Sequence, residues 1–421
     1  MSQRPNNLFY AAGEDLRNTI RVEIRLTEPV EPAALTQAAA LAASRFPYFA
    51  VTLVRDGEQF ILEQNDAPFV ITHGIRPVRL NSAQSGRHLI SFAWEGDLLF
   101  IDTTHFIMDG QSMFPFLQTL LYCYLKILHP EAAFDESRIA LPGSRIPAEE
   151  FDDDPYPDRP VPTEPLPVRK RPGEILKPAG QLQGYDNMKH WTSFIFRVQQ
   201  KELMNYVSGV DGSPASFAAS IMCRAIQELY PENTLPIVCG MQHQFRGALG
   251  KPRSHLCHVN IVPIVYPDSL RAAPIDRLNT IGRGTLILQA DNEHDLLTVN
   301  VHIRNEQAIR DMTLSGKQKY MRRVLLDGIG NNTFEVSYTG RVNWAGLDRY
   351  ISYVSPCLDL TLSGGVSVEI FSCADDFIIN IMQRNEDPGI ITEIRKLFEE
   401  NGIVCHVEKA GHFEVAEFEM P

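Results

Sequence analysis

The sequence lacks any apolar run long enough to cross a membrane, which requires about 18–20 residues. The best candidate, Phe114–Leu128, is interrupted by glutamine, lysine and tyrosine side chains. The N-terminus is polar, so we expect no secretion signal and a cytoplasmic location. The seven cysteines are widely spaced and contain no C-x-x-C pair. This spacing favours buried free thiols and argues against disulfides or a metal site.

The sequence also lacks an excess of basic residues. Lys and Arg number 39 against 52 Asp and Glu, which gives a net charge of −13. Proteins that bind nucleic acid usually carry a basic surface, so this balance argues against a nucleic-acid partner. An anionic substrate would need its own local donors, because the overall field does not attract it. Hydrophobic residues make up 44% of the chain, which is ordinary globular usage.

A proline-rich stretch divides the chain into two halves. Ten of its 28 prolines lie between Pro142 and Pro178. Proline removes a backbone donor and fixes φ, so neither helix nor sheet persists there. We therefore predict an N-terminal subdomain at residues 1–141, a crossover linker at 142–180 and a C-terminal subdomain at 181–421. Both halves alternate helices with strands, which favours an α/β architecture built from two similar units.

Local patterns predict the elements of each half. Turn signals such as Asp56-Gly57 predict hairpins, and Ser213-Pro214 is typical of a helix start. The predicted strands are 19–26, 48–54, 59–63, 88–94, 98–106, 191–198, 235–242, 259–266, 333–339, 366–371 and 377–383. The predicted helices are 32–46, 112–128, 214–230, 275–290 and 388–401.

The segment with the clearest chemical content is His105–Gly110, which reads HFIMDG. It lies between a predicted apolar strand and a long apolar helix, where α/β proteins commonly place reactive groups. Neutral imidazole accepts a proton at about pH 7, so His105 suits a general base. The residues alone leave a plainer interpretation open, in which His105 is a core residue and Asp109 only caps the next helix.

HFIMDG resembles the H-x-x-x-D-G motif of the chloramphenicol-acetyltransferase-like superfamily, which includes condensation domains, alcohol acetyltransferases and plant BAHD acyltransferases. The alanine-rich helix that ends in Ser44–Pro47 resembles the start of these proteins. Val259–Pro263 resembles their second-half core, and Val336–Val342 resembles the strand that approaches their active site. The resemblance implies two chloramphenicol-acetyltransferase-like subdomains, each a mixed sheet flanked by helices, with an active-site channel between them.

The sequence departs from the two best-known branches of the superfamily. Thr104 stands where condensation domains commonly carry a first histidine, and no D-F-G-W-G motif of the plant enzymes is present. Leu256-Cys257 stands where many members have Gly-Asn. A stand-alone acyltransferase that acts on an alcohol or an amine therefore fits the pattern best.

The resemblance implies acyl transfer from a thioester, either acyl-CoA or an acyl carrier protein, to a hydroxyl or amine of a small molecule. His105 would be the general base, and no bound cofactor is expected because a thioester is already activated. One alternative is a stand-alone condensation enzyme that joins carrier-bound substrates. Another is a catalytically silent relative that serves as a binding or scaffold module.

The resemblance also implies roles for five further residues. Asp109 and Gly110 would be structural at the active site, and we expect Arg246 to pair with Asp109. Ser337 and Thr339 are candidate donors to the tetrahedral oxyanion in the channel. The residues alone also allow Arg246 to be a surface charge, and Ser337 and Thr339 to belong to a plain exposed strand face.

Overall fold

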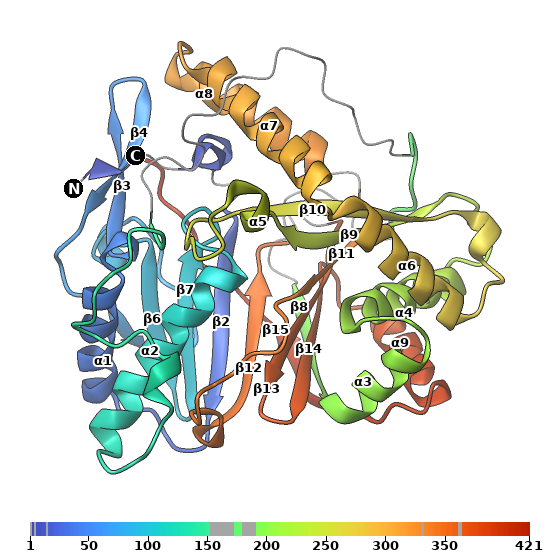
Figure 1. The fold of residues 1–421 in the computed structure, drawn as a ribbon, viewed down its shortest axis with the longest axis horizontal. Helices are drawn as coiled ribbons and strands as arrows, with labels where there is room; N and C mark the ends of the chain where they lie inside the picture. Colours follow the sequence, from blue (N-terminus) through green and yellow to red (C-terminus); the bar gives the residue numbers. More distant parts are fainter. Residues whose placement is uncertain are drawn as a thin grey trace.

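The computed structural model describes residues 2–3, 6–13, 16–151, 172–178, 191–329, 332–360 and 364–421. Two large mixed sheets stand side by side, and helices pack against them (Figure 1). The structure thus confirms the α/β fold class of two subdomains, each a mixed sheet flanked by helices. No helix in the described part of the chain is long and apolar enough to span a membrane.

The first sheet has five strands in the order β12-β2-β7-β6-β5, and its pairs are antiparallel except for β5–β6. Helix α1 begins with Pro32, whose missing N–H is one that a first helical turn leaves unbonded in any case. It packs against α2. The bounds are β2 (Thr19–Leu26), α1 (Pro32–Arg45), β5 (Ile71–His73), β6 (Ile90–Glu95), β7 (Leu98–Thr104) and α2 (Gly110–Leu128). A small separate sheet contains β1 (Ser2–Gln3), β4 (Gln59–Gln64) and β3 (Val51–Asp56).

The second sheet has seven strands in the order β10-β9-β11-β13-β14-β8-β15. Strand β11 runs parallel to both of its neighbours, and the other pairs are antiparallel. Helix α4 begins at Pro214 behind the capping side chain of Ser213, as predicted. The strands are β8 (Thr192–Gln199), β9 (Ile237–Gln244), β10 (Val259–Tyr266), β11 (Phe334–Tyr338), β13 (Val366–Cys373), β14 (Asp376–Gln383) and β15 (Cys405–His412). The helices are α3 (Gln200–Gly209), α4 (Pro214–Leu229), α5 (Arg246–Leu249), α6 (Ile275–Gln289) and α9 (Gly389–Glu400).

Segments from the second half of the chain also pair with segments of the first half. Strand β12 (Ile351–Leu358) pairs antiparallel with β2, and Phe418 near the C-terminus forms a bridge with Leu80. Residues 152–171 and 179–180 of the predicted linker lie outside the described residues. The division of the chain into 1–141, 142–180 and 181–421 therefore stays a prediction.

Two helices cross from the second half to the first, along the top of Figure 1. These are α7 (Asn292–Ile309) and α8 (Leu314–Ile329). The far helix, α8, packs against the short 3-10 helix Asn7–Ala11 and contributes Met321 to the core of the first half. The pair was not predicted from the sequence, and it covers the space between the two halves.

Most predicted boundaries are confirmed within three residues. The hairpin turns place Gly57 and Gly96 at φ of +57° and +60°, a conformation that glycine adopts without a Cβ penalty. The largest shift is at β3, which begins at Val51 rather than at Tyr48, because Pro47–Phe49 forms a 3-10 turn.

Candidate active site

A cavity of about 790 Å³ lies between the two halves. Its walls come from β2, β12 and α2 on one side and from β9, β10, β11 and β13 on the other, with α7 and α8 above. Four of the six predicted site residues line it, namely His105, Gly110, Ser337 and Thr339. The other two, Asp109 and Arg246, are buried beside it.

The end of β7 positions His105. Its backbone N–H donates to the carbonyl oxygen of Asn18 at 2.8 Å, which ties the residue to the start of β2. The next three residues, Phe106–Met108, are buried, and the ring of Phe106 packs 5.0 Å from that of Phe9. Because apolar side chains anchor the turn on one side, the imidazole is held toward the cavity on the other.

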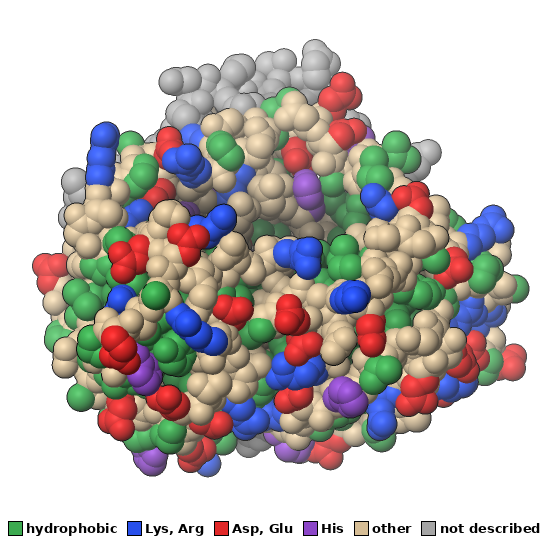
Figure 2. Space-filling view, turned by 60° about the horizontal axis from the view of Figure 1, so that its bottom comes forward, with side chains coloured by type: hydrophobic (Ala, Val, Ile, Leu, Met, Phe, Trp, Pro, Cys, Tyr) green, Lys and Arg blue, Asp and Glu red, His purple; other side chains and the backbone are tan. Residues whose placement is uncertain are grey.

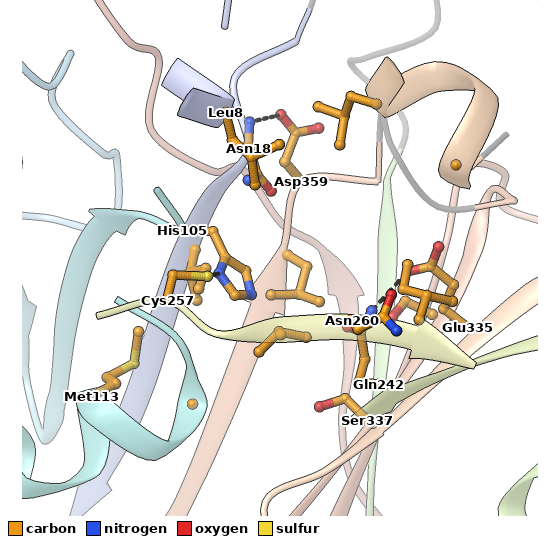
Figure 3. A pocket seen from close by; sticks show the side chains of 18 of the residues that line it. Leu8, Asn18, His105, Met113, Gln242, Cys257, Asn260, Glu335, Ser337 and Asp359 are labelled. Atoms are coloured by element: carbon orange, nitrogen blue, oxygen red, sulfur yellow. Dashed lines mark hydrogen bonds between the residues drawn. The ribbon is translucent and has the colours of Figure 1, made fainter. Parts of the chain in front are cut away.

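A cysteine that sequence reasoning did not assign to the site contacts His105. The Sγ atom of Cys257 lies 3.7 Å from His105 Nδ1, and Figure 3 shows the other ring nitrogen directed away from Cys257. Burial, with a further contribution from the Asp109 charge, raises the pKa of the Cys257 thiol to about 12. A thiol that stays protonated at neutral pH is a hydrogen-bond partner and not a thiolate nucleophile. The one sequence feature that singles out Cys257 is that Leu256-Cys257 stands where many members of the superfamily have Gly-Asn.

Asp109 links the His105–Gly110 turn to α2. Its side chain accepts a hydrogen bond from the backbone N–H of Ser112 at 3.1 Å, and the Ser112 hydroxyl accepts from the Asp109 N–H at 2.8 Å. This reciprocal pair is a capping box, which satisfies donors that the first helical turn leaves unbonded. The backbone N–H of His258 donates to the same carboxylate at 3.0 Å.

Arg246 provides the counter-charge to Asp109 from the other half of the chain. Its Nη2 atom lies 2.8 and 2.7 Å from the two carboxylate oxygens, and both side chains are 1% exposed. The guanidinium also donates to the carbonyl oxygens of Ser254 and Leu256. Burial alone would raise the pKa of Asp109, but the Arg246 charge and the donated hydrogen bonds hold it below its ordinary value.

The position of Arg246 follows from the β9–β10 hairpin, which reaches toward α2 in Figure 1 with α5 at its tip. Arg246 is the first residue of α5, so the tip of a second-half hairpin meets the first turn of α2. The ion pair between Asp109 and Arg246 thereby connects the two walls of the cavity beside His105.

Gly110 lies very close to the side chain of Thr339. A Cβ atom at this position would lie 2.9 Å from the Cγ2 methyl of Thr339, closer than real carbon atoms approach. Thr339, which follows β11, therefore lies so close to the first turn of α2 that a side chain at position 110 would force the Thr339 methyl to move. This contact places Thr339 beside the His105–Gly110 turn.

Alternate residues of β11 and β13 form the wall of the cavity on the second sheet. Successive strand residues face opposite sides, so Glu335 and Ser337 share one face of β11, and Thr339, just after the strand, also lines the cavity. Glu369 on β13 stands opposite Ser337 in the parallel register, and the two side chains are hydrogen-bonded. The two glutamates were not assigned by sequence reasoning, because single carboxyls in apolar strands carry no motif.

His255, Cys257 and His258 form a cluster in the sequence whose residue types are ones that bind zinc. In the structure His255 Nδ1 lies 2.6 Å from the hydroxyl of Tyr48, and His258 Nε2 lies 3.1 Å from that of Ser254. Within the described residues, no group of three or more His, Cys, Asp or Glu side chains could hold a metal ion. The three side chains of the cluster therefore have separate partners.

Comparison with known proteins gives structural matches only. No protein-family model matches the sequence, and no curated protein matches it. Among solved structures, F. sporotrichioides TRI101 complexed with coenzyme A and T-2 matches with a TM-score of 0.61 and 10% identity, over 96% of this chain and 99% of that chain.

Two other solved structures match over nearly the whole chain. The condensation domain of the monacolin K polyketide synthase MokA has a TM-score of 0.55 and 9% identity, with 95% of this chain and 96% of that chain covered. Polyketide synthase associated protein 5 from Mycobacterium tuberculosis has a TM-score of 0.53 and 15% identity, with coverages of 90% and 93%. The chain therefore has the two-subdomain fold of the chloramphenicol-acetyltransferase-like proteins, with the HFIMDG segment at the cavity between its halves.

Proposed function

We propose that this protein transfers an acyl group from a thioester to a hydroxyl or amine of a small molecule, with His105 as the general base. The observation that supports this most strongly is the position of His105, whose ring lines the cavity between the halves while Nδ1 contacts Cys257. At about 790 Å³ the cavity has the size of a small-molecule site. TRI101, which has the same fold, was crystallised with coenzyme A, and this supports acyl-CoA as the donor.

The reaction follows from the orientation of the imidazole. The acceptor O–H or N–H gives its proton to Nε2 of His105 while its oxygen or nitrogen bonds to the thioester carbonyl carbon. The tetrahedral intermediate collapses as the C–S bond breaks, and the thiolate takes the proton back from the imidazolium. The protein forms no covalent bond, in agreement with a Cys257 thiol that stays protonated.

Two hydroxyls, Ser337 on β11 and Thr339 just after it, are candidates to stabilise the oxyanion. Thr339 lies next to Gly110, whereas the hydroxyl of Ser337 is engaged with Glu369. We therefore assign Thr339 as the first candidate donor and Ser337 as the second. Removal of such a donor typically costs about 2.7–4 kcal/mol of transition-state stabilisation.

Asp109 and Arg246 serve a positioning role in this mechanism. Each carboxylate oxygen of Asp109 is already bonded within the protein, so the side chain does not face the substrate. The ion pair holds the turn that carries His105 against the second half. A change at Asp109 therefore acts on the rate through the geometry of His105.

The test is the release of free thiol from acetyl-CoA in the presence of a panel of alcohols and amines, with the acetylated acceptor identified by mass spectrometry. The wild-type protein releases thiol only with an acceptor present. His105→Ala lowers this rate by about a hundredfold to ten-thousandfold, the usual contribution of a general base. The matched control is His73→Ala, because His73 is an exposed histidine outside the cavity.

Three outcomes distinguish the proposed mechanism from its alternatives. Turnover that persists in His105→Ala removes His105 from the role of base. Turnover with an acetylated carrier protein but not with acetyl-CoA replaces the CoA donor by a carrier-bound one. If neither donor releases thiol with any acceptor, acyl transfer is wrong, and a binding or scaffold role replaces it.

A further inference from the structure

The wall of the cavity formed by the second sheet contains two buried carboxyl groups. Glu335 on β11 and Glu369 on β13 are 6% and 5% exposed and line the same cavity as His105. Glu335 and Ser337, on one face of β11, lie across the cavity from His105 in Figure 3. The carboxyls therefore lie where a substrate that reaches His105 would contact them.

Glu369 has hydroxyl partners but no cation. The Ser367 hydroxyl donates to its Oε1 atom at 3.3 Å, and Ser337 also hydrogen-bonds it. Within the described part of the chain no Lys, Arg or His forms an ion pair with Glu369. Burial, with the nearby Glu335, raises the pKa of Glu369 to about 8. A buried carboxyl without a counter-charge lowers stability, so the fold carries a cost that its own contacts do not offset.

The carboxyls that line the cavity differ in their partners: Asp327 lies 3.5 Å from Arg323, and the Glu335 charge acts on Lys177, whereas Glu369 has no cation among the described residues. Among the described residues that line it, four carry carboxyls and none is Lys or Arg. Elsewhere the signs mix, and Figure 2 shows Lys and Arg side chains interspersed with Asp and Glu over the surface in view. Low-dielectric walls strengthen the field of a charge inside a cavity, so the Glu369 carboxylate favours a cationic group beside it. The four residues are Asp327, Glu335, Asp359 and Glu369.

The remainder of the lining is largely apolar. Ile20 and Val22 come from β2, Met113 and Leu117 from α2, and Ile261 from β10. Such walls suit a hydrocarbon segment between two polar ends. A ligand with a cationic end at Glu369, a nucleophilic end at His105 and a hydrocarbon chain between them would match the polar ends and the apolar walls of the cavity.

We infer that the acceptor is an aliphatic amine with a second nucleophilic group, and that Glu369, supported by Glu335, binds its ammonium end. This inference rests on the proposed function, because it names the acceptor of that reaction. The ammonium replaces the missing counter-charge of Glu369 and donates hydrogen bonds to its carboxylate. The hydroxyl or neutral amine at the other end of the chain is the group that His105 deprotonates.

The experiment compares three acceptors that share a five-carbon chain and a terminal hydroxyl. The second end is an ammonium in aminopentanol, a hydroxyl in pentanediol and a carboxylate in hydroxypentanoate. Thiol release from acetyl-CoA gives kcat/KM for each, and calorimetry measures the binding of aminopentanol without any thioester. The variant is Glu369→Gln, and the control is Asp375→Asn, which removes an exposed carboxyl from the turn of the same β13–β14 hairpin.

We expect the wild-type protein to prefer aminopentanol over pentanediol, and pentanediol over hydroxypentanoate. Glu369→Gln lowers kcat/KM for aminopentanol by roughly 10- to 100-fold, mostly through KM, because the charged partner of the ammonium is lost. It lowers the pentanediol value less than the aminopentanol value, because a hydroxyl end has no charge to pair with Glu369. Asp375→Asn behaves as the wild-type protein.

Failure of the inference and failure of the proposed function give different results. If pentanediol is acetylated as well as aminopentanol, or if Glu369→Gln keeps the preference, the inference is wrong and acyl transfer stands. If aminopentanol binds in a Glu369-dependent way but no thiol is released, the binding site is supported and acyl transfer is wrong. An absence of measurable aminopentanol binding overturns the inference. If Glu369→Gln does not fold, the ranking of kcat/KM for the three acceptors in the wild-type protein still tests the inference.

Discussion

Two buried carboxyl groups at one cavity have opposite environments. Asp109 receives an arginine and two backbone N–H groups, and its pKa is lowered. Glu369 receives only serine hydroxyls, and its pKa is raised to about 8. The two groups differ little in exposure, so the difference comes from the partners that the fold supplies.

The contrast separates a structural carboxyl from one that is available to a ligand. A buried charge is tolerated when it is paired and hydrogen-bonded, and Asp109 meets both conditions through Arg246. A carboxyl that the protein leaves without a cation gains most from a cation that arrives from outside. Variants at both carboxyls and at their neighbours test whether this difference holds, in decreasing order of effect.

Asp109→Asn should cause the largest loss of stability. Removal of one partner of a buried ion pair leaves Arg246 uncompensated, which typically costs about 3–5 kcal/mol. Urea denaturation measures this free energy of unfolding. The matched control is Glu149→Gln at the exposed pair with Arg253, for which we expect about 0–1 kcal/mol.

The Asp109 effect should also depend on pH. Because the folded pKa lies below the ordinary 3.8, the ionised carboxylate stabilises the fold above that value, and its contribution is lost as pH falls through the folded pKa. The wild-type protein and Asp109→Asn therefore converge in stability in acid. A loss below about 1 kcal/mol at neutral pH would contradict the structural role.

Glu369→Gln should raise the stability of the fold, whereas Asp109→Asn lowers it. The folded pKa of about 8 lies above the ordinary 4.5, so the wild-type protein loses stability as pH rises through this window. The amide keeps the contacts with Ser337 and Ser367 but has no charge to bury. We expect Tm to rise by a few degrees at alkaline pH and to match the wild-type value in acid. A variant that is less stable than the wild-type protein at alkaline pH would remove the contrast with Asp109.

Gly110→Ala tests how closely the two walls approach each other. The new methyl overlaps the Thr339 methyl, and overpacking of this kind costs about 1–3 kcal/mol. The double variant Gly110→Ala with Thr339→Ser removes the opposing methyl and should recover most of the lost stability and rate. A double-mutant cycle measures the coupling. Additive effects would show that the close approach does not occur in solution.

Replacement of Cys257 should have the smallest effect. Cys257→Ala removes the contact with His105 Nδ1 and leaves the ring free to turn, so we expect kcat to fall by about tenfold or less. Cys257→Ser keeps a hydrogen-bonding atom and should retain more activity than the alanine variant. The pH dependence of kcat should shift in Cys257→Ala, whereas a purely packing role would leave it unchanged.

Local signals made much of the fold predictable from the sequence. Capping residues such as Ser213 and turn glycines such as Gly57 act within a few residues of the chain, so their patterns are visible without tertiary contacts. The same holds for the turn between β7 and α2, where the strand, the HFIMDG segment and the helix follow one another directly.

Other features depend on contacts that are distant in sequence. Strand β12 joins the first sheet by pairing with β2, and no local pattern encodes that choice of partner. Buried positions in α7 are few and do not form a continuous apolar stripe, so its periodicity was weak. The pairing of Cys257 with His105 spans 152 residues. The contact of Cys257 with His105 and the burial of Glu369 therefore follow from the tertiary structure and not from local sequence.

The most direct test of the central claim is a single-turnover measurement in which excess protein is mixed with acetyl-CoA and a saturating acceptor. The proposed mechanism predicts that the wild-type protein forms acetylated acceptor and free thiol together, with no acetylated protein at any time. It predicts that His105→Ala still binds acetyl-CoA but forms product at least about a hundredfold more slowly. A single-turnover rate in His105→Ala close to that of the wild-type protein would contradict the role of His105 as the base.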